Sequence, residues 1–347
     1  MMHSTLVVSA AGLPLGLLTH ELWVRAGYKE QSSRERKNTA LEEKESYRWI
    51  TALQKTAERI PATTTVVTLC DREADIYEFL AEAQRLEAKF VVRAAWDRHL
   101  NHPDYPRLWP LVEAQAIAGS VTLDLLPRKT RAARTARLAI RFTLVPLAPP
   151  QRHRIAVSVP LPLLSVYAVH VKELAPPPDE PAVEWMLLTN VPVQSFADAC
   201  ERVEWYRNRW HVEEFHKILK SGCRVETCRL QTAPRLIRYV TLTSVIAWRL
   251  YWFTYLNRTA PTDEATPMLT AGELAALQTL NPEEDSSSTA PLTVRDALRR
   301  IAKLGGFLGR RHDGEPGITA IWRGWQRLSD FTLMWSLVTK RQLMGNS

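Results

Sequence analysis

The chain has 347 residues, enough for about two domains with a buried core. Its 46% hydrophobic and 24% charged residues are typical of a globular protein and argue against a disordered chain. The 45 Lys and Arg exceed the 37 Asp and Glu, giving a formal net charge of +8. Such a surplus favours polyanions such as nucleic acid, although many basic proteins bind none.

The cysteines and the hydropathy pattern indicate the compartment. The four cysteines form no C-x-x-C pair, so we expect free thiols in a reducing environment. No basic lead precedes the apolar N-terminus, and no apolar run is long enough to cross a bilayer. We therefore expect a cytoplasmic protein with no membrane partner.

The first part of the chain alternates strands with helices. Two apolar runs around Gly12 and Pro14 predict a β-hairpin, and Pro61 ends the first helical pattern. The predicted elements are strands over 4–11 and 15–25, a loop over 28–42, a helix over 43–59, a strand over 64–70, a helix over 75–86 and a strand over 90–93. This alternation predicts a mixed α/β sheet.

The middle of the chain, from about Trp96, is β-rich. Residues 134–145 alternate large apolar side chains with small or basic ones, as a half-buried strand does, and 166–171 and 185–188 are similar. Proline-rich breaks cover 146–162 and 176–181. We predict an all-β insertion.

Basic residues gather near this insertion. They fit a charged strand edge that deters unwanted pairing as well as they fit a phosphate-binding face. These residues are Arg128, Lys129, Arg131, Arg134, Arg137 and Arg141.

The last part of the chain is predicted to be helical. Helical periodicity covers 196–221, and a long apolar helix follows Pro234 to about Leu256. After a polar linker over 257–267 and a loop over 285–289, helices resume at Val294.

Two acidic residues follow the predicted strand over 64–70. Asp71 lies at its C-terminal end, where α/β proteins commonly place functional groups, so a site and a solvated turn are equally good interpretations. Asp75 is better interpreted as the N-cap of the next helix.

A second group of polar residues recurs along the predicted helix over 196–221. On an ideal helix they fall within an arc of about 80°, beside an apolar stripe. A surface face with ion pairs, such as Glu213 with Lys217 or Arg209, explains such a group well. One carboxylate among three cations also suits a metal ion and a phosphodiester. The group consists of Tyr206, Arg209, Glu213, Lys217 and Lys220.

These motifs together resemble those of the insertion-sequence-four family of DDE transposases. Tyr206-x-x-Arg209-x-x-x-Glu213-x(6)-Lys220 resembles the family's Y-R-E-K signature, and Asp71-Arg-Glu-Ala-Asp75 resembles its D-R-E-A-D segment. Further similarity, in order along the chain, lies at 90–93, 185–189, 213–217, 301–307 and 317–325.

The resemblance implies a ribonuclease H-like mixed sheet with a β-rich insertion, followed by an all-α C-terminal region. The implied domains are the first part of the core over 1–95, the insertion over 96–192, the second part of the core over 193–235 and a dimerisation region over 236–347.

The resemblance also implies a cut-and-paste activity on the DNA ends of an insertion sequence. Asp71 and Glu213 would hold two Mg²⁺ ions, and Trp185 would stabilise a base flipped from the duplex, although it could equally pack into the insertion. The residues expected to contact DNA are Arg72, Arg93, Trp185, Tyr206, Arg209, Lys217 and Lys220.

The first catalytic Asp of the family is not found in this sequence. The family carries it on the strand before a hairpin like the first one here, and no Asp precedes Asp71. We therefore expect an N-terminally truncated transposase with weakened Mg²⁺ binding, no strand transfer and at most weak nicking. The alternatives are an active enzyme whose start codon lies upstream, and a dead remnant or dimerising inhibitor that forms mixed dimers with full-length transposase. A basic DNA-binding protein without nuclease ancestry fits the charge but not the ordered motifs.

Overall fold

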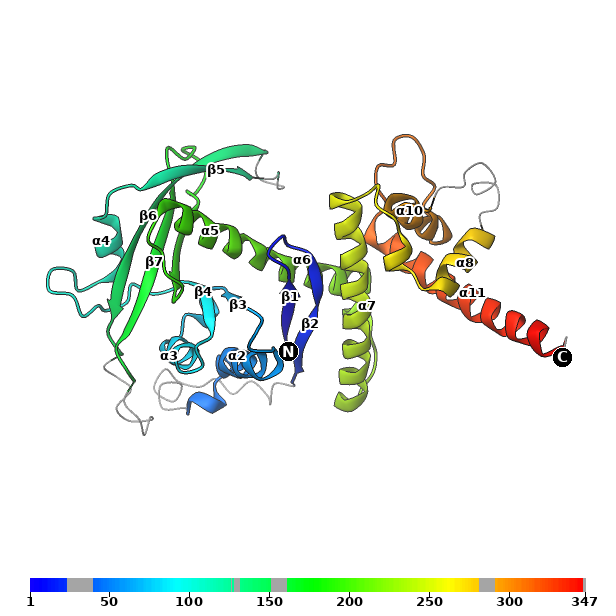
Figure 1. Cartoon of the computed structure of the whole chain (residues 1–347), viewed down its shortest axis with the longest axis horizontal. Coiled ribbons are helices and arrows are strands. Elements are labelled where there is room, and N and C mark those ends of the chain that lie inside the picture. Colours follow the sequence, from blue (N-terminus) through cyan, green and yellow to red (C-terminus); the bar gives the residue numbers. More distant parts are fainter. Residues whose placement is uncertain (24–39, 126, 128–131, 151–160, 281–290, 346–347) are drawn as a thin grey trace. The chain divides into compact units, whose positions relative to one another are not determined.

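The computed structural model describes residues 1–23, 40–125, 127, 132–150, 161–280 and 291–345 (Figure 1). The chain divides into two compact units. We call Arg25–Arg209 the sheet unit, and Met1–Val24 with Trp210–Ser347 the helical unit. Outside the described residues lie most of the predicted loop over 28–42, the loop over 285–289, and Arg128, Lys129 and Arg131.

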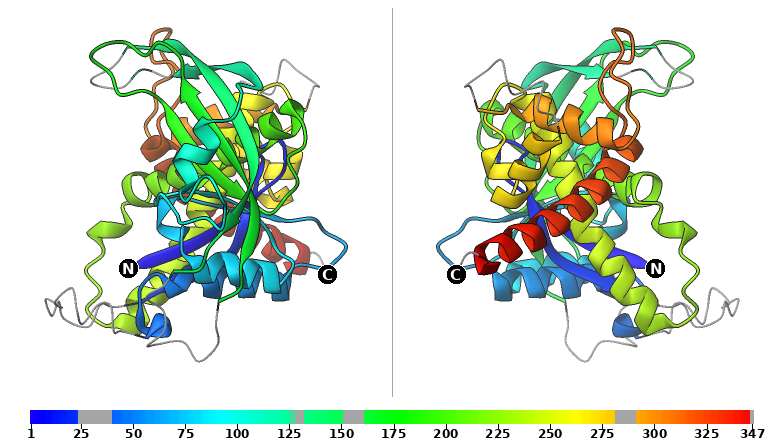
Figure 2. Two further views of the ribbon diagram at one scale, coloured as in Figure 1. Left: turned by 90° about the vertical axis from the view of Figure 1, so that its left-hand side faces the viewer. Right: turned by 90° about the vertical axis from the view of Figure 1, so that its right-hand side faces the viewer.

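One six-stranded mixed sheet forms the centre of the sheet unit, with strand order β3-β4-β8-β7-β6-β5. Its strands are β3 (Val67–Cys70), β4 (Lys89–Arg93), β5 (Gly119–Leu125), β6 (Arg134–Leu147), β7 (Leu164–Glu173) and β8 (Glu184–Thr189). Strands β3 and β4 are parallel, and every other neighbouring pair is antiparallel. The strands of the predicted insertion therefore continue the sheet that β3 and β4 begin, and the sheet is twisted (Figure 2).

Both faces of this sheet are buried, because apolar residues occupy consecutive positions along its central strands. Phe90 and Val92 point to one face and pack with α2 (Tyr47–Arg59), α3 (Tyr77–Arg85) and α4 (Leu108–Glu113). Val91 and Leu187 point to the other face and pack with α5 (Phe196–Arg207). Packing on both faces therefore holds the central strands of the sheet in place, including the C-terminal end of β4.

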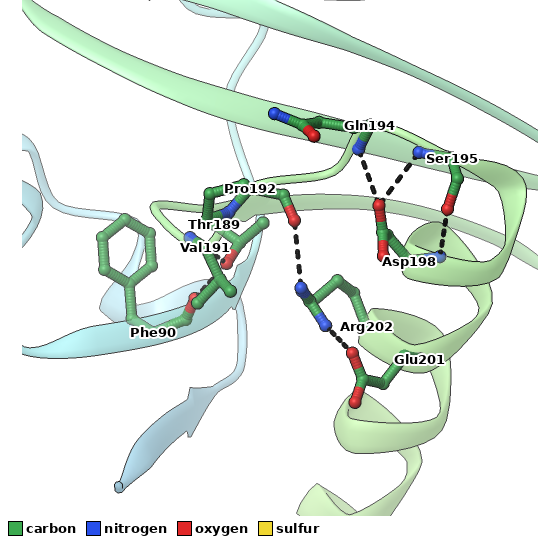
Figure 3. A network of polar contacts seen from close by, with 9 residues as sticks. All are labelled: Phe90, Thr189, Val191, Pro192, Gln194, Ser195, Asp198, Glu201 and Arg202. Carbon is green, nitrogen blue, oxygen red and sulfur yellow. Dashed lines mark hydrogen bonds and ion pairs between the residues drawn. The ribbon is translucent and has the colours of Figure 1, made fainter.

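Helix α5 begins with a capping box (Figure 3). The Ser195 hydroxyl accepts a hydrogen bond from the Asp198 amide at 3.1 Å, and the Asp198 carboxylate accepts from the amides of Gln194 and Ser195 at 2.9 and 3.0 Å. Farther along the helix, Arg202 donates to the Pro192 carbonyl at 3.0 Å. These bonds set the start of the helix that ends beside Tyr206.

The sequence interpretation was wrong at three points in the sheet unit. Asp75 does not cap α3: the residue before that helix is Ile76, and Asp75 is buried, with its carboxylate bonded to the loop after β4. The insertion is not all-β, because it contains α4. Pro146 lies within β6 and not in a break. It is tolerated there because β5 pairs only with residues 134–140 of β6.

The helical unit combines a hairpin with a set of helices around one apolar core. Strands β1 (Met2–Val8) and β2 (Pro14–Leu22) pair antiparallel as a two-stranded sheet of their own, which confirms the predicted hairpin. The longer helices are α6 (His211–Lys217), α7 (Ala233–Thr259), α8 (Ala271–Thr279), α10 (Val294–Leu304) and α11 (Ile318–Gly345). Short 3-10 turns cover Leu41–Glu43 and Arg72–Ala74 in the sheet unit and Val225–Thr227 and Thr266–Met268 in the helical unit.

The predicted helix over 196–221 is not one regular α-helix. A 3-10 turn, Asn208–Trp210, separates α5 from α6, and a π-helical turn, Ile218–Gly222, follows α6. Asn208 is a poor helix former, because its side chain competes for backbone hydrogen bonds. The ideal spacing that placed five polar residues in one narrow arc therefore does not hold along this segment.

Helices α10 and α11 approach each other closely through two glycines. A Cβ atom on Gly324 would lie 1.7 Å from the Ile301 carbonyl oxygen, and one on Gly305 would lie 1.9 Å from the Ala320 carbonyl oxygen. Any other residue at either position would separate the helices. Both glycines belong to segments that carry the family resemblance, so part of that resemblance reflects packing.

These features confirm the predicted fold class: a ribonuclease H-like α/β sheet with a β-rich insertion and a helical C-terminal region. Among the described helices, none combines the length and apolarity needed to span a bilayer.

Candidate functional site

Asp71 lies at the edge of the sheet where β3 and β4 both end. The two strands are parallel and Cys70 pairs with Val92, so Asp71 and Arg93 leave the sheet at the same edge. The Asp71 carboxylate accepts a hydrogen bond from the Glu73 amide at 2.9 Å and caps the 3-10 turn Arg72–Ala74. Asp71, half-buried, is therefore held by the backbone of its own loop.

Arg93 connects this edge to β8. Its guanidinium donates a hydrogen bond to the Glu184 carbonyl at 2.9 Å, next to Trp185. Burial lowers the pKa of Arg93, and the positive charges of Arg72 and Arg209 lower it further. The positive charges of Arg72, Arg93 and Arg209 therefore lie near enough at this edge to repel one another.

Tyr206 lies among these charges at the end of α5. Its ring is buried and meets the Trp185 ring edge-on at 5.7 Å between centroids, and the Arg209 guanidinium lies 5.7 Å from its centroid. Burial raises the pKa of Tyr206, while Arg209 and Arg93 lower it and Asp71 raises it. Asp71, Arg93, Tyr206 and Arg209 thus form one electrostatic group.

We call Asp71, Arg72, Arg93, Trp185, Tyr206 and Arg209 the edge group. All of them lie in the sheet unit, and they come from four stretches of chain far apart in the sequence. Guanidinium groups together with aromatic rings and a carboxylate are the side chains that bind a phosphodiester, because guanidinium groups donate to phosphate oxygens and the rings contact sugars and bases.

The remaining predicted site residues lie in the helical unit. Glu213 is on α6, partly buried, and Lys220 is on the π-helical turn. Lys217 pairs with Glu214 at 3.7 Å and Lys220 pairs with Glu226 at 3.7 Å, and both lysines are exposed. These surface pairs are weak and leave both ammonium groups accessible.

Two sequence models of known families match the chain. The model of the transposase DDE domain matches residues 49–248, and the model of the transposase Tn5 dimerisation domain matches residues 245–335. The first match covers more than half of the chain and includes the whole edge group and Glu213, Lys217 and Lys220. The chain belongs to the DDE transposase family.

Members of this family use divalent metal ions and act on DNA, and the dimerisation domain supports self-association of this transposase. The partly exposed Asp71 carboxylate, on a backbone-anchored turn, is a hard oxygen ligand of the kind that suits a divalent ion. Roles of individual residues in metal or DNA binding stay predictions.

One other group of possible metal ligands occurs among the described residues. Ligand atoms of Glu113, His170 and Glu184 lie within 4.8 Å of one another. However, the Lys172 ammonium lies 3.2 and 3.5 Å from the two carboxylates and already offsets one of their two negative charges. His170 Nε2 lies 2.7 Å from Glu184, and its buried Nδ1 has no partner in the described structure. A metal ion bound to Nε2 would place the ring proton on Nδ1, where the buried N–H would have no acceptor. A proton on Nε2, donated to Glu184, avoids this.

The arginines of the insertion differ from those of the edge group. Arg134 pairs with Glu173 and with Glu180, the latter at 2.9 Å. Arg137 donates to Ser120 and Arg141 to the Gln115 carbonyl. The interpretation as an unpaired strand edge is wrong for Arg134 and Arg137, because this part of β6 pairs with β5. The ion pairs of Arg134 favour a structural role over phosphate binding.

Proposed function

We propose that this chain belongs to a transposase of the insertion-sequence-four family, which cleaves DNA at the ends of an insertion sequence and transfers the strands. By itself, without the family's first catalytic Asp, the chain should nick DNA weakly at most. The observation that carries the proposal is the edge group itself, in which the anchored carboxylate of Asp71 and the guanidinium groups of Arg93 and Arg209 all act on Tyr206 within the matched DDE region. Such a site binds a phosphodiester and places it against an acidic metal ligand.

In this proposal Asp71 and Glu213 are the acidic ligands of Mg²⁺, which supplies activation of the attacking oxygen and stabilises charge on the phosphate. Glu213 belongs to the helical unit and Asp71 to the sheet unit, so their convergence on the same ions is part of the proposal. The match of residues 245–335 to the dimerisation domain supports assembly of two copies on paired DNA ends.

The basic and aromatic residues bind the DNA in this proposal. Arg72, Arg93 and Arg209 contact phosphate oxygens and Tyr206 contacts the backbone between them. Lys217 and Lys220 supply further phosphate contacts. Trp185, partly buried against Tyr206, stabilises a base that has left the duplex.

Matched acidic variants test the catalytic roles on DNA that carries the terminal repeats of the element. Made in an active full-length form of the transposase, Asp71→Asn and Glu213→Gln should each reduce Mg²⁺-dependent cleavage by about a thousandfold or more and leave DNA binding largely intact. The controls are Glu73→Gln, on the same turn as Asp71, and Glu214→Gln, adjacent to Glu213; both should retain cleavage. Equal loss in the controls would contradict the assignment.

The convergence of the two ligands can be tested without catalysis. When Fe²⁺ replaces Mg²⁺ and generates hydroxyl radicals, the polypeptide should break near both Asp71 and Glu213. Excess Mg²⁺ should suppress both breaks, and each asparagine or glutamine variant should weaken both. Breaks at only one of the two positions would show that the carboxylates do not share an ion.

The match to the dimerisation domain supports a second function, inhibition of an active transposase through mixed dimers. Addition of this chain to an active transposase of the same family should then reduce cleavage as mixed dimers form, measured by sedimentation and by cleavage of end DNA. A chain that cuts end DNA unaided supports the first function, and one that binds but never cuts supports the second. The expectation of weak cleavage by the chain alone stays a prediction.

A further inference from the structure

Trp96 is an exposed tryptophan on the loop that follows β4. Its exposed fraction of 66% is the highest of any tryptophan in the described structure. A large aromatic ring in water is unfavourable, and tryptophan is normally well buried. If hydrogen bonds hold the loop in one conformation, the ring is presented to solvent in a fixed position, as a binding residue would be.

The loop is held by a buried carboxylate. Asp75, only 3% exposed, accepts hydrogen bonds from the amides of Ala95 and Trp96 at 2.7 and 3.1 Å. Arg98 donates to the same carboxylate at 2.8 Å and to the Asp75 carbonyl at 2.7 Å. The Trp96 backbone is therefore fixed directly, and its ring is presented to solvent from an ordered support.

The other side of the loop is fixed as well. The Asp97 carbonyl accepts from Arg107 at 2.8 Å, and its carboxylate accepts from the Trp109 amide at 3.0 Å. Preceding Trp96, the Ala94 amide donates to the Met186 carbonyl at 2.7 Å. Residues on both sides of Trp96 are thus hydrogen-bonded. Because folding already orders this loop, binding of a ligand loses little further conformational entropy there.

The loop starts at the edge group. Trp96 follows Arg93 by three residues, a length of chain that spans at most roughly 11 Å. A ring this close to Arg93 lies within reach of a strand whose phosphate contacts that arginine. Flat aromatic faces beside arginines are the usual means of holding unpaired bases, because every base can stack.

We propose that Trp96 stacks on an unpaired nucleobase of the DNA bound at the edge group. The inference rests on the proposed function and adds a second aromatic contact, independent of Trp185, on a different element. Asp75 and Arg98 act as positioning residues for this ring.

The test measures binding of the full chain to a duplex that ends in a short single-stranded extension, with Ca²⁺ in place of Mg²⁺ to prevent cutting. Trp96→Ala should weaken binding of this DNA about 5- to 150-fold, the effect of one base–aromatic stack, and should change binding of the blunt duplex little. Trp96→Phe should retain most of the affinity and Trp96→Leu should not, because leucine keeps the apolar bulk without a stacking face. Leu144→Ala, which removes another exposed side chain of the same unit, is the control and should have no effect.

A 2-aminopurine base in the extension reports stacking directly. Its fluorescence should fall on binding of the wild-type chain and of Trp96→Phe, and fall less with Trp96→Ala. Equal affinity and equal quenching for Trp96→Ala and wild type would overturn the inference while leaving the proposed function intact. A change in self-association without a change in DNA binding would also overturn it. Failure of the wild-type chain to bind either DNA would instead count against the proposed function.

Discussion

Two groups of arginines on the same sheet differ in how their charge is balanced. Around Arg93, burial and the neighbouring Arg72 and Arg209 lower the pKa of the guanidinium. Around Arg134, hydrogen bonds to Glu173 and Glu180 raise the pKa of the guanidinium. The same residue type thus meets crowded positive charge at one place and paired negative charge at the other.

This difference separates binding from structure. Neighbouring cations repel one another, and a phosphate that binds them relieves this repulsion. Paired cations gain little from a phosphate, because they would first have to give up their carboxylates. Arg98, paired with the buried Asp75, belongs with Arg134 in this respect.

The largest expected effect concerns a paired arginine. Asp75→Ala leaves Arg98, almost fully buried, without its carboxylate and two loop amides without their acceptor. We expect the free energy of unfolding to fall by about 3–5 kcal/mol, measured by urea denaturation. Asp97→Ala, which removes one amide contact from the same loop, should cost about 1 kcal/mol. Similar losses for the two variants would show that the Asp75 pair is not the main support of the loop.

The next effect tests the crowded arginines. Arg93→Ala and Arg209→Ala should each lower DNA affinity by about 1.5–3 kcal/mol, as loss of a charge-assisted phosphate contact does. Each should also reduce the slope of log affinity against log salt by about 1. Arg134→Ala should leave affinity and slope unchanged and lower the melting temperature. Loss of DNA affinity in Arg134→Ala would remove the distinction between the two groups.

The sequence predicted the sheet edge well but could not assign its two aspartates. The strand before Asp71 and the strand before Arg93 follow from apolar runs, and their meeting at one edge follows from a parallel α/β arrangement. Whether Asp71 or Asp75 caps a turn depends on where the loop at 95–98 folds back, about twenty residues later in the chain. Local propensity contains no information on that contact.

The irregular helix and the exposed tryptophan show the same limit. The ideal period predicted one face for five polar residues, and the 3-10 and π-helical turns that interrupt it have no clear period of their own. Trp96 marked only a change of composition in the sequence. Its exposure follows from the tertiary structure, since the loop that presents it is held by Asp75.

Acid should weaken the helical unit, where half-buried histidines have lowered pKa values. Burial, with smaller effects of Lys220 and His20, lowers the pKa of His216 to about 4, and burial lowers the pKa of His20 too. A histidine whose folded pKa is lowered binds its proton more readily when unfolded. Its stabilising contribution is therefore full above about pH 6.5 and is lost as the pH falls towards 4.

For His216 this loss amounts to about 2 kcal/mol by pH 5. Urea denaturation at pH 7.5 and pH 5 should show it, and His216→Gln should make the two stabilities more alike. His102→Gln, in the sheet unit, is the control and should leave the difference as in the wild type. An unchanged pH dependence in His216→Gln would place the acid sensitivity elsewhere.

The smallest expected effect concerns the start of α5, the helix that brings Tyr206 to the edge group. Ser195→Ala removes the acceptor for the Asp198 amide and should lower the free energy of unfolding by about 1 kcal/mol. The Asp198 carboxylate accepts hydrogen bonds from the amides of Gln194 and Ser195, so Asp198→Ala should also lower the free energy of unfolding. Because α5 is also held by Arg202 and by its apolar face against the sheet, neither variant should shift Tyr206 or change DNA affinity. A drop in affinity comparable to that of Arg93→Ala would mean that the position of the edge group depends on this cap, and that stability and binding are less separate on this sheet than the two kinds of arginine indicate.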